Sequence, residues 1–355
     1  MTAELKPTPW TPGPDTFQPI PHAKLAATFD RPRLVVVIDT EEEFDWARPL
    51  ARANVAVSNI AEQPRAQALF RPRGVVPTYV VDYPVAADAD SAAVMRGFVD
   101  GGEAVIGAHL HPWVTPPDRE AVTPVNSYAG NLPADLERAK MERLTDAIET
   151  ATGVRPSVYK AGRYGFGPNT ARLLAELGYE VDTSMVAHSA FTADGGPDYT
   201  RVAGQPAWLA GPGEILELPL TAGFAGVARA AGARAFPRLT GPWATRLRLP
   251  GVLARSRVLE KIRLSPEGTT LAEMKRLTTA LLADGQRVFC LAYHSSTLLP
   301  GGSPYAATPG DVTAFLDRIA GYLDFFLEEI GGVPATPLEI RSALGPPTQG
   351  GRNGR

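Results

Sequence analysis

Short apolar runs alternate along the chain with longer segments of helical character. The runs are brief, often β-branched, and bounded by glycine, proline or charged residues, as buried parallel strands usually are. They cover Leu34–Ile38, Val75–Val81, Ala104–Ile106, Val158–Lys160, Tyr179–Val181, Ile215–Leu218 and Val288–Ala292. This alternation predicts an α/β fold built from parallel βα units, and seven strands indicate a barrel of the TIM type with one unit fewer. A doubly wound open sheet is the alternative.

The segments between the runs carry helix stop signals. The expected helices are Pro133–Thr152, Pro168–Leu177, Thr270–Ala283 and Thr313–Ile330. Each is followed within two residues by a glycine, which readily ends a helix. Asn131 is a candidate N-cap for the first helix.

The remaining segments divide the chain into a core and its appendages. Residues 1–32 read as a Pro-rich arm, 33–344 as a single barrel domain, and 345–355 as a disordered tail. Between the sixth and seventh strands, at about 222–265, the simple rhythm is interrupted by a basic insertion. The stretch from Leu218 to Leu259 holds no acidic residue. Its arginines are Arg229, Arg234, Arg238, Arg246, Arg248, Arg255 and Arg257.

Composition and charge narrow the functional classes. The chain has 355 residues, 44% of them hydrophobic and 21% charged, with a formal net charge of -3. This balance disfavours a nucleic-acid partner. Met1–Pro21 lacks the apolar core of a signal peptide and no run reaches the roughly 18 residues of a membrane span, so a cytoplasmic location is expected. Cys290, the single cysteine, cannot form an internal disulfide and is expected to be a buried thiol.

An acidic pair follows the first strand. Asp39 and Glu41 are two residues apart, so in extended backbone both project to the same face. Two carboxylates on one face repel unless a cation lies between them. The arrangement therefore suits a general base beside a metal ligand.

A histidine pair follows the third strand. His109 and His111 are again two apart, so both imidazoles face one side, as two ligands of a single Zn²⁺ must. In βα barrels the carboxyl ends of the strands meet on one rim. The acidic pair and the histidine pair are therefore expected to lie together.

Other polar residues follow later strands. His294 follows the last strand and could donate a proton to a leaving amine. Asp182 follows the fifth strand. After the fourth, Lys160 and Arg163 offer cations, while Gly162 and Gly165 would let backbone N–H groups approach a developing oxyanion. The motifs of serine hydrolases, P-loop nucleotidases and zincins are not found in the sequence.

Taken together, these segments resemble the NodB-homology polysaccharide deacetylases, the fourth carbohydrate esterase family, and within it the WalW-like branch. The order of motifs from Asp39 to His294 is the order in that family, and the resemblance covers about residues 30–340. It implies a distorted (β/α)₇ barrel and metal-dependent removal of N-acetyl groups from an amino sugar or glycan precursor.

The resemblance also implies roles for individual residues. Asp39 takes the place of the general base and His294 that of the general acid. Glu41, His109 and His111 take the place of the metal ligands, although the family's second histidine lies four positions after the first, where this chain has Trp113. The family's arginine, which contacts the base, aligns with Lys160. We favour Arg163 for this charge, with Asp182 helping to fix the charged partner.

Several alternatives remain open. A member of the same fold could hydrolyse a small cyclic amide or ureide, and a third interpretation is a non-catalytic glycan-binding relative. For the deacetylase, the expected cofactor is a divalent metal, most simply Zn²⁺. The expected substrate is an acetylated amino sugar. The basic segment 229–257 suits the phosphate of a nucleotide- or lipid-linked form of that sugar, or the surface of a membrane.

Overall fold

Seven parallel strands form the centre of the molecule. The structure, a computed structural model, describes residues 9–211, 213–239, 246 and 249–346. The strands are β2 (Arg33–Thr40), β3 (Thr78–Val81), β4 (Val105–Leu110), β5 (Val158–Ala161), β6 (Val181–Asp182), β10 (Leu216–Glu217) and β13 (Val288–His294). Their order is β10-β6-β5-β4-β3-β2-β13, with every neighbouring pair parallel. Each expected run therefore overlaps one strand, and the α/β prediction is confirmed.

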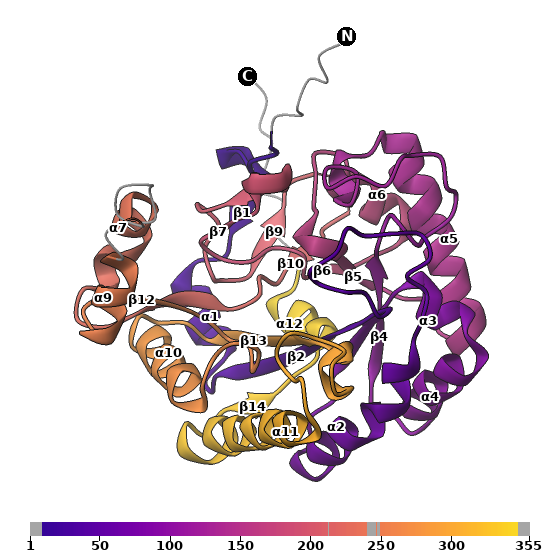
Figure 1. Ribbon diagram of the computed structural model, residues 1–355. Coiled ribbons are helices and arrows are strands. Elements are labelled where there is room, and N and C mark those ends of the chain that lie inside the picture. Colours follow the sequence, from indigo (N-terminus) through magenta and orange to yellow (C-terminus); the bar gives the residue numbers. More distant parts are fainter. Residues whose placement is uncertain (1–8, 212, 240–245, 247–248, 347–355) are drawn as a thin grey trace, which may run out of the picture.

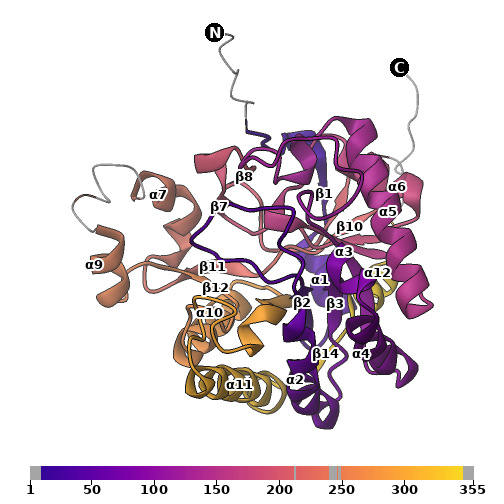
Figure 2. The ribbon, with the colours of Figure 1, turned by 45° about the vertical axis from the view of Figure 1, so that its right-hand side comes forward.

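Helices surround this sheet on its outer side (Figures 1 and 2). They are α2 (Gln63–Phe70), α3 (Tyr83–Ala87), α4 (Ala89–Asp100), α5 (Ala134–Thr152), α6 (Thr170–Leu177), α10 (Leu271–Ala283) and α11 (Pro309–Asp324). The glycine stops act as expected: Gly153 and Gly178 adopt φ of 77° and 83° at the ends of α5 and α6. The Asn131 cap is wrong, because the N-cap of α5 is Pro133. Asn131 instead donates to the carbonyls of Val125 and Gly195.

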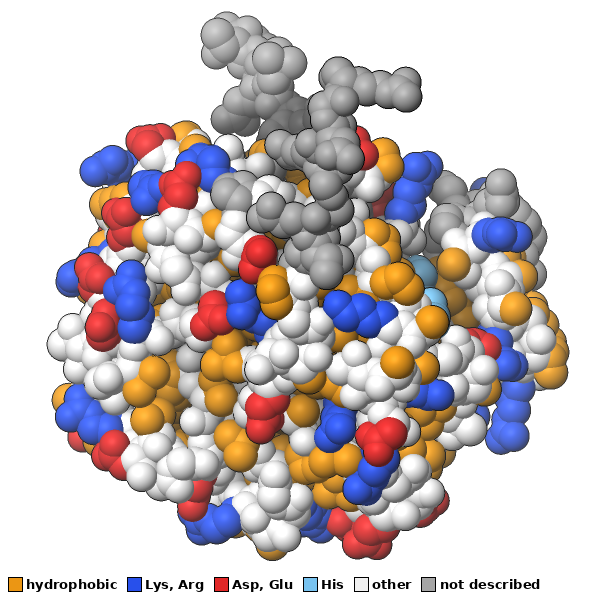
Figure 3. Space-filling view, turned by 180° about the vertical axis from the view of Figure 1, so that it is seen from behind, with side chains coloured by type: hydrophobic (Ala, Val, Ile, Leu, Met, Phe, Trp, Pro, Cys, Tyr) orange, Lys and Arg blue, Asp and Glu red, His pale blue; other side chains and the backbone are white. Residues whose placement is uncertain are grey.

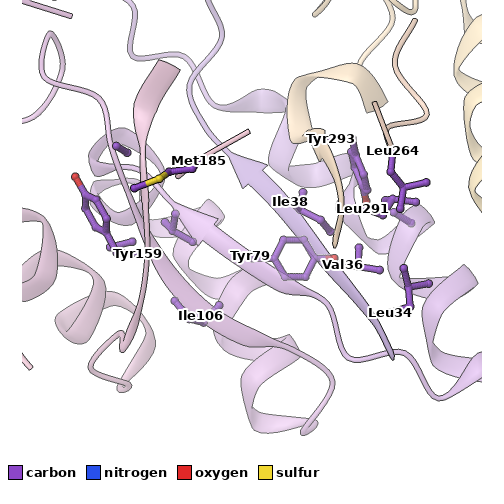
Figure 4. Packing of buried hydrophobic residues seen from close by; sticks show 14 of the residues in the cluster. Leu34, Val36, Ile38, Tyr79, Ile106, Tyr159, Met185, Leu264, Leu291 and Tyr293 are labelled. Carbon is purple, nitrogen blue, oxygen red and sulfur yellow. The ribbon is translucent and has the colours of Figure 1, made fainter. Parts of the chain in front are cut away.

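The inside and outside of the barrel follow the two-residue period of the strands. Val35 and Val37 of β2 face inward and pack with Val80 and Val158. Leu34, Val36 and Ile38 face outward and pack with Tyr79, Leu291 and other residues beneath the helices (Figure 4). Asp39 continues the inward series at the carboxyl end of β2. The same alternation that buries the valines therefore aims Asp39 into the barrel.

The interior is narrow and closed at its amino-terminal end. A Cβ added at Gly107 of β4 would lie 2.8 Å from both Val80 Cγ1 and the Val158 carbonyl oxygen. Below the valines, Leu25 and Ile340 join the inner cluster from α1 (His22–Thr28) and α12 (Pro337–Leu344). Because this end is filled, the carboxyl ends of the strands form the open end.

The barrel is not closed by strand pairing. Beyond β10, the sheet continues antiparallel through β9 (Ala207–Leu209) to β1 (Phe17–Pro19), which lies within the expected N-terminal arm. Between β10 and β13 the seam is bridged by two residues. The amide of Thr221 donates to the Cys290 carbonyl (3.1 Å), and the carbonyl of Leu264 accepts from the Ala292 amide (3.3 Å). The fold is thus a distorted, open (β/α)₇ barrel.

The expected insertion between the sixth and seventh strands contains a strand pair and helices. β11 (Ala222–Ala225) pairs antiparallel with β12 (Glu260–Arg263), and α7 (Gly232–Leu239) and α9 (Leu249–Arg255) lie to one side of the barrel in Figure 1. Arg229 is ion-paired with Asp284 at 3.1 Å. Residues 240–245 and 247–248 of the basic segment, and 347–355 of the expected tail, lie outside the described residues.

Smaller elements complete the described chain. β7 (Ser189–Ala190) pairs with β8 (Asp198–Tyr199), and β14 (Val333–Pro334) pairs parallel with the start of β2. Within the described ranges, none of the helices combines the length and apolar character needed to traverse a bilayer.

Candidate metal centre and active site

The acidic pair and the histidine pair meet at the open end of the barrel. Glu41 Oε2 lies 3.5 Å from His109 Nε2 and 3.4 Å from His111 Nε2. The ligand atoms of the three residues lie within 4.8 Å of one another, and all three side chains are buried. One carboxylate and two imidazoles form a common ligand set for Zn²⁺.

The imidazoles are oriented by hydrogen bonds at their far nitrogens. His109 Nδ1 donates to the Lys160 carbonyl at 3.0 Å, and His111 Nδ1 lies 2.7 Å from Glu42 Oε2. These contacts leave both Nε2 lone pairs directed toward Glu41, as metal-binding histidines require. Burial lowers the pKa of both rings, that of His111 to about 4, so they are neutral at pH 7.

Glu41 is the least satisfied member of this group. Its Oε1 is buried and has no hydrogen-bond partner among the described residues. Burial, together with the charges of Glu42 and Asp39, raises the pKa of Glu41 well above its usual range. A cation between the three ligands would supply the missing partner and stabilise the carboxylate. The residues present therefore fit a divalent metal.

A second acidic group lies behind His111. Glu42 accepts from His111 and, through Oε1, from Trp113 Nε1 at 2.7 Å, while its amide donates to Asp82 Oδ2 at 2.7 Å. Burial raises the pKa of Glu42 to about 7. Trp113 stacks on His111 with ring centroids 4.2 Å apart. Trp113 therefore packs against His111 and helps to hold its ring in place. In the family that this sequence resembles, the position of Trp113 is that of the second histidine.

Gly162 makes room for the second histidine. A Cβ at this position would lie 2.2 Å from His111 Cδ2 and 2.6 Å from the Leu110 carbonyl oxygen. The amide of Gly165 donates to the Gly162 carbonyl at 3.0 Å and is therefore engaged within the turn. The approach of other backbone N–H groups to an oxyanion stays a prediction. These glycines serve packing at the end of β5.

Asp39 lies beside the three ligands and is paired with Lys160. Lys160 Nζ donates to both Asp39 oxygens, at 2.5 and 2.6 Å, and both side chains are buried. Burial would raise the pKa of Asp39, but the charge and hydrogen bonds of Lys160, together with the charge of His294, outweigh it and lower the pKa to about 2. Asp39 is therefore ionised at neutral pH.

Our preference for Arg163 as the partner of Asp39 is corrected by this geometry. Arg163 follows β5 with a left-handed φ of 53°, and its guanidinium binds Ser127 and Asp194. Lys160 instead follows Val158 in the inward series of β5, which directs its ammonium to Asp39. Arg163 contributes to the wall of the cavity.

Asp182 lies deeper in the barrel than expected for a partner of the charged pair. It accepts from the amide and hydroxyl of Ser184, at 3.1 and 2.6 Å, and lies opposite Glu217 across the β6–β10 pair. Burial and the charge of Asp182 raise the pKa of Glu217 well above its usual range. The charge of Lys160 acts on Asp182 from a distance, since the ammonium of Lys160 is ion-paired with Asp39 and not with Asp182.

His294 occupies the other side of Asp39. Its Nε2 lies 3.6 Å from Asp39 Oδ2, and its Nδ1 lies 2.8 Å from Glu267 Oε2. Glu267 also accepts from the His294 amide and the Thr297 hydroxyl through Oε1. Although burial opposes it, the charge of Glu267 raises the pKa of His294. The sequence interpretation missed Glu267, which follows the insertion and lies on no periodic segment.

These side chains line a cavity of about 440 Å³ at the open end of the barrel. Its walls carry aromatic side chains, including Phe44, Trp46 and Tyr305. Trp46 contacts His294 edge-on at 4.9 Å between ring centroids and Tyr305 at 6.0 Å. The volume is within the usual range for small-molecule sites, which is roughly 300–1,000 Å³.

Comparisons with known proteins reveal likeness in structure. A protein of Mycobacterium smegmatis assigned as a polysaccharide deacetylase matches 97% of this chain and 98% of its own, at 18% identity and a TM-score of 0.50. One of Pseudomonas aeruginosa PAO1 with the same assignment matches 91% and 94%, at 15% identity and 0.51. The PuuE allantoinase matches 92% and 94%, at 16% identity and 0.53. No protein-family model and no curated protein matches the sequence.

These matches extend over nearly the whole of each chain. They show that this chain has the fold of the polysaccharide deacetylases, as the resemblance implied. The WalW-like branch stays a prediction.

Proposed function

We propose that this chain, with its polysaccharide-deacetylase fold, is a metal-dependent hydrolase that removes the N-acetyl group from an amino sugar. One observation carries the proposal: the Glu41–His109–His111 group shares a cavity with an ionised Asp39 and with His294. The cavity thus combines a ligand set, a base and an acid. Metal-assisted amide hydrolysis uses all three, because the water must be activated and the departing amine must be protonated.

The metal is the first part of the proposal. Glu41, His109 and His111 would hold it, and Zn²⁺ suits one carboxylate with two neutral imidazoles. When bound, such an ion polarises an acyl oxygen and lowers the pKa of a water toward roughly 7.

Asp39 and His294 divide the proton transfers. Asp39 takes a proton from the attacking water as the oxygen bonds to the acyl carbon. Lys160 holds both oxygens of Asp39 and so fixes its orientation. His294, whose pKa is raised, donates from Nε2 to the amine nitrogen as the C–N bond breaks, leaving acetate and a free amine. The environments push the two pKa values apart, which assigns the base and the acid.

The aromatic wall suits a sugar ring. Phe44 and Trp46 stack at 5.2 Å, next to His294 and Tyr305, so apolar faces lie beside the reacting groups. A pyranose offers one such apolar face together with hydroxyl groups. The nucleotide- or lipid-linked form of the sugar, membrane contact through segment 229–257 and the cytoplasmic location all stay predictions.

The second candidate function is hydrolysis of a cyclic ureide, and the allantoinase fold match favours it.

Purified protein loaded with Zn²⁺ should be assayed on chito-oligosaccharides for acetate release, and in parallel on allantoin. We expect acetate release that chelation abolishes. Asp39→Asn should lose this activity while retaining metal, because a base is lost and not a ligand. Turnover of allantoin alone would overturn the proposal in favour of the second candidate.

A further inference from the structure

Outside the candidate metal site, the acidic and basic residues that line the cavity form ion pairs, with one exception. Each of three lining carboxylates has a lining cation as its partner: Asp39 with Lys160, Asp45 with Arg48 and Asp194 with Arg163. The remaining carboxylate, Glu41, belongs to the candidate metal site. Arg263 is left over, because no carboxylate among the described residues lies within ion-pair distance of its guanidinium. The face of the molecule shown in Figure 3 also carries basic and acidic side chains side by side.

Arg263 is nevertheless held in a defined place. It ends β12, where its backbone pairs with Ala222. Its guanidinium carbon lies 5.4 Å from the Tyr164 ring centroid, and Nη1 donates to the Tyr164 hydroxyl at 3.2 Å. Tyr164 is itself fixed, with φ of 63° and a carbonyl that accepts from the Tyr199 hydroxyl. A guanidinium has five N–H donors, and within the described part of the chain that of Arg263 has one acceptor, the Tyr164 hydroxyl, so the other donors can bind a ligand.

The position of Arg263 identifies the part of the substrate that it meets. Besides the main cavity, it lines a small recess together with Asp39, His294 and Glu267. In the proposed function His294 delivers its proton to the leaving amine. Arg263 therefore lies on the amine side of the reaction, next to the group that becomes the product amine.

We infer that the amine portion of the substrate carries an anionic group, a phosphate or a carboxylate, which Arg263 binds. The inference rests on the proposed function for the identity of the reacting groups. A guanidinium recognises both anions by paired, charge-assisted hydrogen bonds. Since Arg263 has no competing carboxylate among the described residues, no internal ion pair must be broken for the anion to bind.

Binding of amine products tests the inference independently of turnover. The Zn²⁺-loaded protein should be titrated calorimetrically with glucosamine, glucosamine 6-phosphate and muramic acid at low and moderate salt. We expect one of the two anions to bind about tenfold more tightly than glucosamine at low salt, with a smaller advantage at higher salt. The phosphate and carboxylate arms distinguish the two kinds of anion.

Variants of Arg263 test whether this residue causes the tighter binding of the anion. Arg263→Gln should remove the preference for the anion and leave glucosamine binding unchanged, whereas Arg263→Lys should keep part of it. Arg65→Gln, at an exposed ion pair with Glu62 on the outside of the barrel, is the matched control and should bind as the wild type does. An anion preference that survives in Arg263→Gln, as direct binding to the metal would produce, overturns the inference. So does a wild type that shows no preference.

Measuring turnover of the corresponding acetylated substrates separates this inference from the proposed function. N-acetylglucosamine and its 6-phosphate, and the N-acetyl form of muramic acid, are compared by kcat/KM in the wild type and Arg263→Gln. Deacetylation of all substrates with equal efficiency would overturn the anion inference and leave the proposed function standing. An anion preference that depends on Arg263, without deacetylation of any substrate, would support the inference and overturn the function.

Discussion

His111 and His294 each place Nδ1 against a glutamate, yet the two pairs differ in charge. Burial lowers the pKa of His111 to about 4, and burial also raises that of its partner Glu42 to about 7. The pair thus tends toward a neutral imidazole with its Nε2 lone pair free. Such a ring can bind a metal.

At His294 the same contact has the opposite outcome. The side chain of His294 is 17% exposed, against 2% for His111. Here the charge of Glu267 outweighs the effect of burial and raises the pKa of the imidazole. Such a ring keeps its proton to a higher pH than an ordinary imidazole does and can act as an acid.

The difference shows that a histidine–glutamate contact does not define a role by itself. The two contacts differ in how deeply they are buried and in what surrounds the glutamate. Glu42 is fully buried among Asp82 and Trp113, whereas Glu267 lies closer to solvent and binds backbone and hydroxyl donors. The same two residue types therefore yield a ligand in one place and an acid in the other.

Replacing His111 or His294 by alanine should separate the ligand role from the acid role, and these changes should have the largest effects on activity. His111→Ala removes one of three ligands, so the dialysed protein should lose its metal and its activity together. His294→Ala should retain stoichiometric metal and lower kcat by about 10²–10⁴, as loss of a general acid does. Elemental analysis and acetate release measure both. Full activity of His294→Ala on acetylated amines would contradict the acid role, and metal loss in that variant would contradict the division between the two histidines.

A smaller perturbation should test the position of His111 without removing it. In Gly162→Ala the new Cβ would meet His111 Cδ2 at 2.2 Å, so the ring must move. We expect metal affinity to fall by about 10–100-fold, the range seen when the support of a ligand is lost. Metal titration with a competing chelator measures this.

Gly97→Ala is the matched control for that substitution. Gly97 lies in α4, and nothing lies within 4 Å of an added Cβ there. Its metal affinity should be unchanged, and its unfolding free energy should rise by about 0.5–1 kcal/mol because alanine favours the helix. Unchanged metal affinity in Gly162→Ala would mean that the ring can shift without loss.

The sequence was sufficient for the parts of the molecule that depend on periodicity. Seven apolar runs located the seven parallel strands, and the polar residues after them located Asp39, Glu41, His109, His111 and His294 in one cavity. The two-residue period explains this success. Applied to β5, the same period would have selected Lys160, which shares the inward parity of Val158. We chose Arg163 instead, which follows the strand in a left-handed turn.

What could not be predicted depends on tertiary contacts without a local pattern. Glu267 lies 27 residues before His294, after an insertion, and only the fold brings the two together. The three-residue strands β1 and β9 are too short for a periodic signal. Asn131 was misassigned as a helix cap because nothing local shows that its amide is used by the carbonyls of Val125 and Gly195.

Removing the charge of Glu267 tests the comparison between the two histidine–glutamate pairs, and it should have the smallest effect on activity of the changes considered. The pKa of His294 is raised above its usual 6.5, so the acid form persists to a higher pH and activity falls as pH rises through that raised pKa. Glu267→Gln retains hydrogen-bonding atoms but loses the charge, so the alkaline limb of the kcat/KM profile should move to lower pH. Well below both pKa values the variant should work nearly as well as the wild type. By linkage, the stability that this pair contributes is fully present below pH 6.5 and is lost as pH rises through the folded pKa, so the variant should lose most stability at acidic pH.

Glu62→Gln, at an exposed ion pair with Arg65 on the outside of the barrel, is the control and should leave the profile unchanged. An alkaline limb that stays in place in Glu267→Gln would show that the carboxylate does not set the protonation of His294.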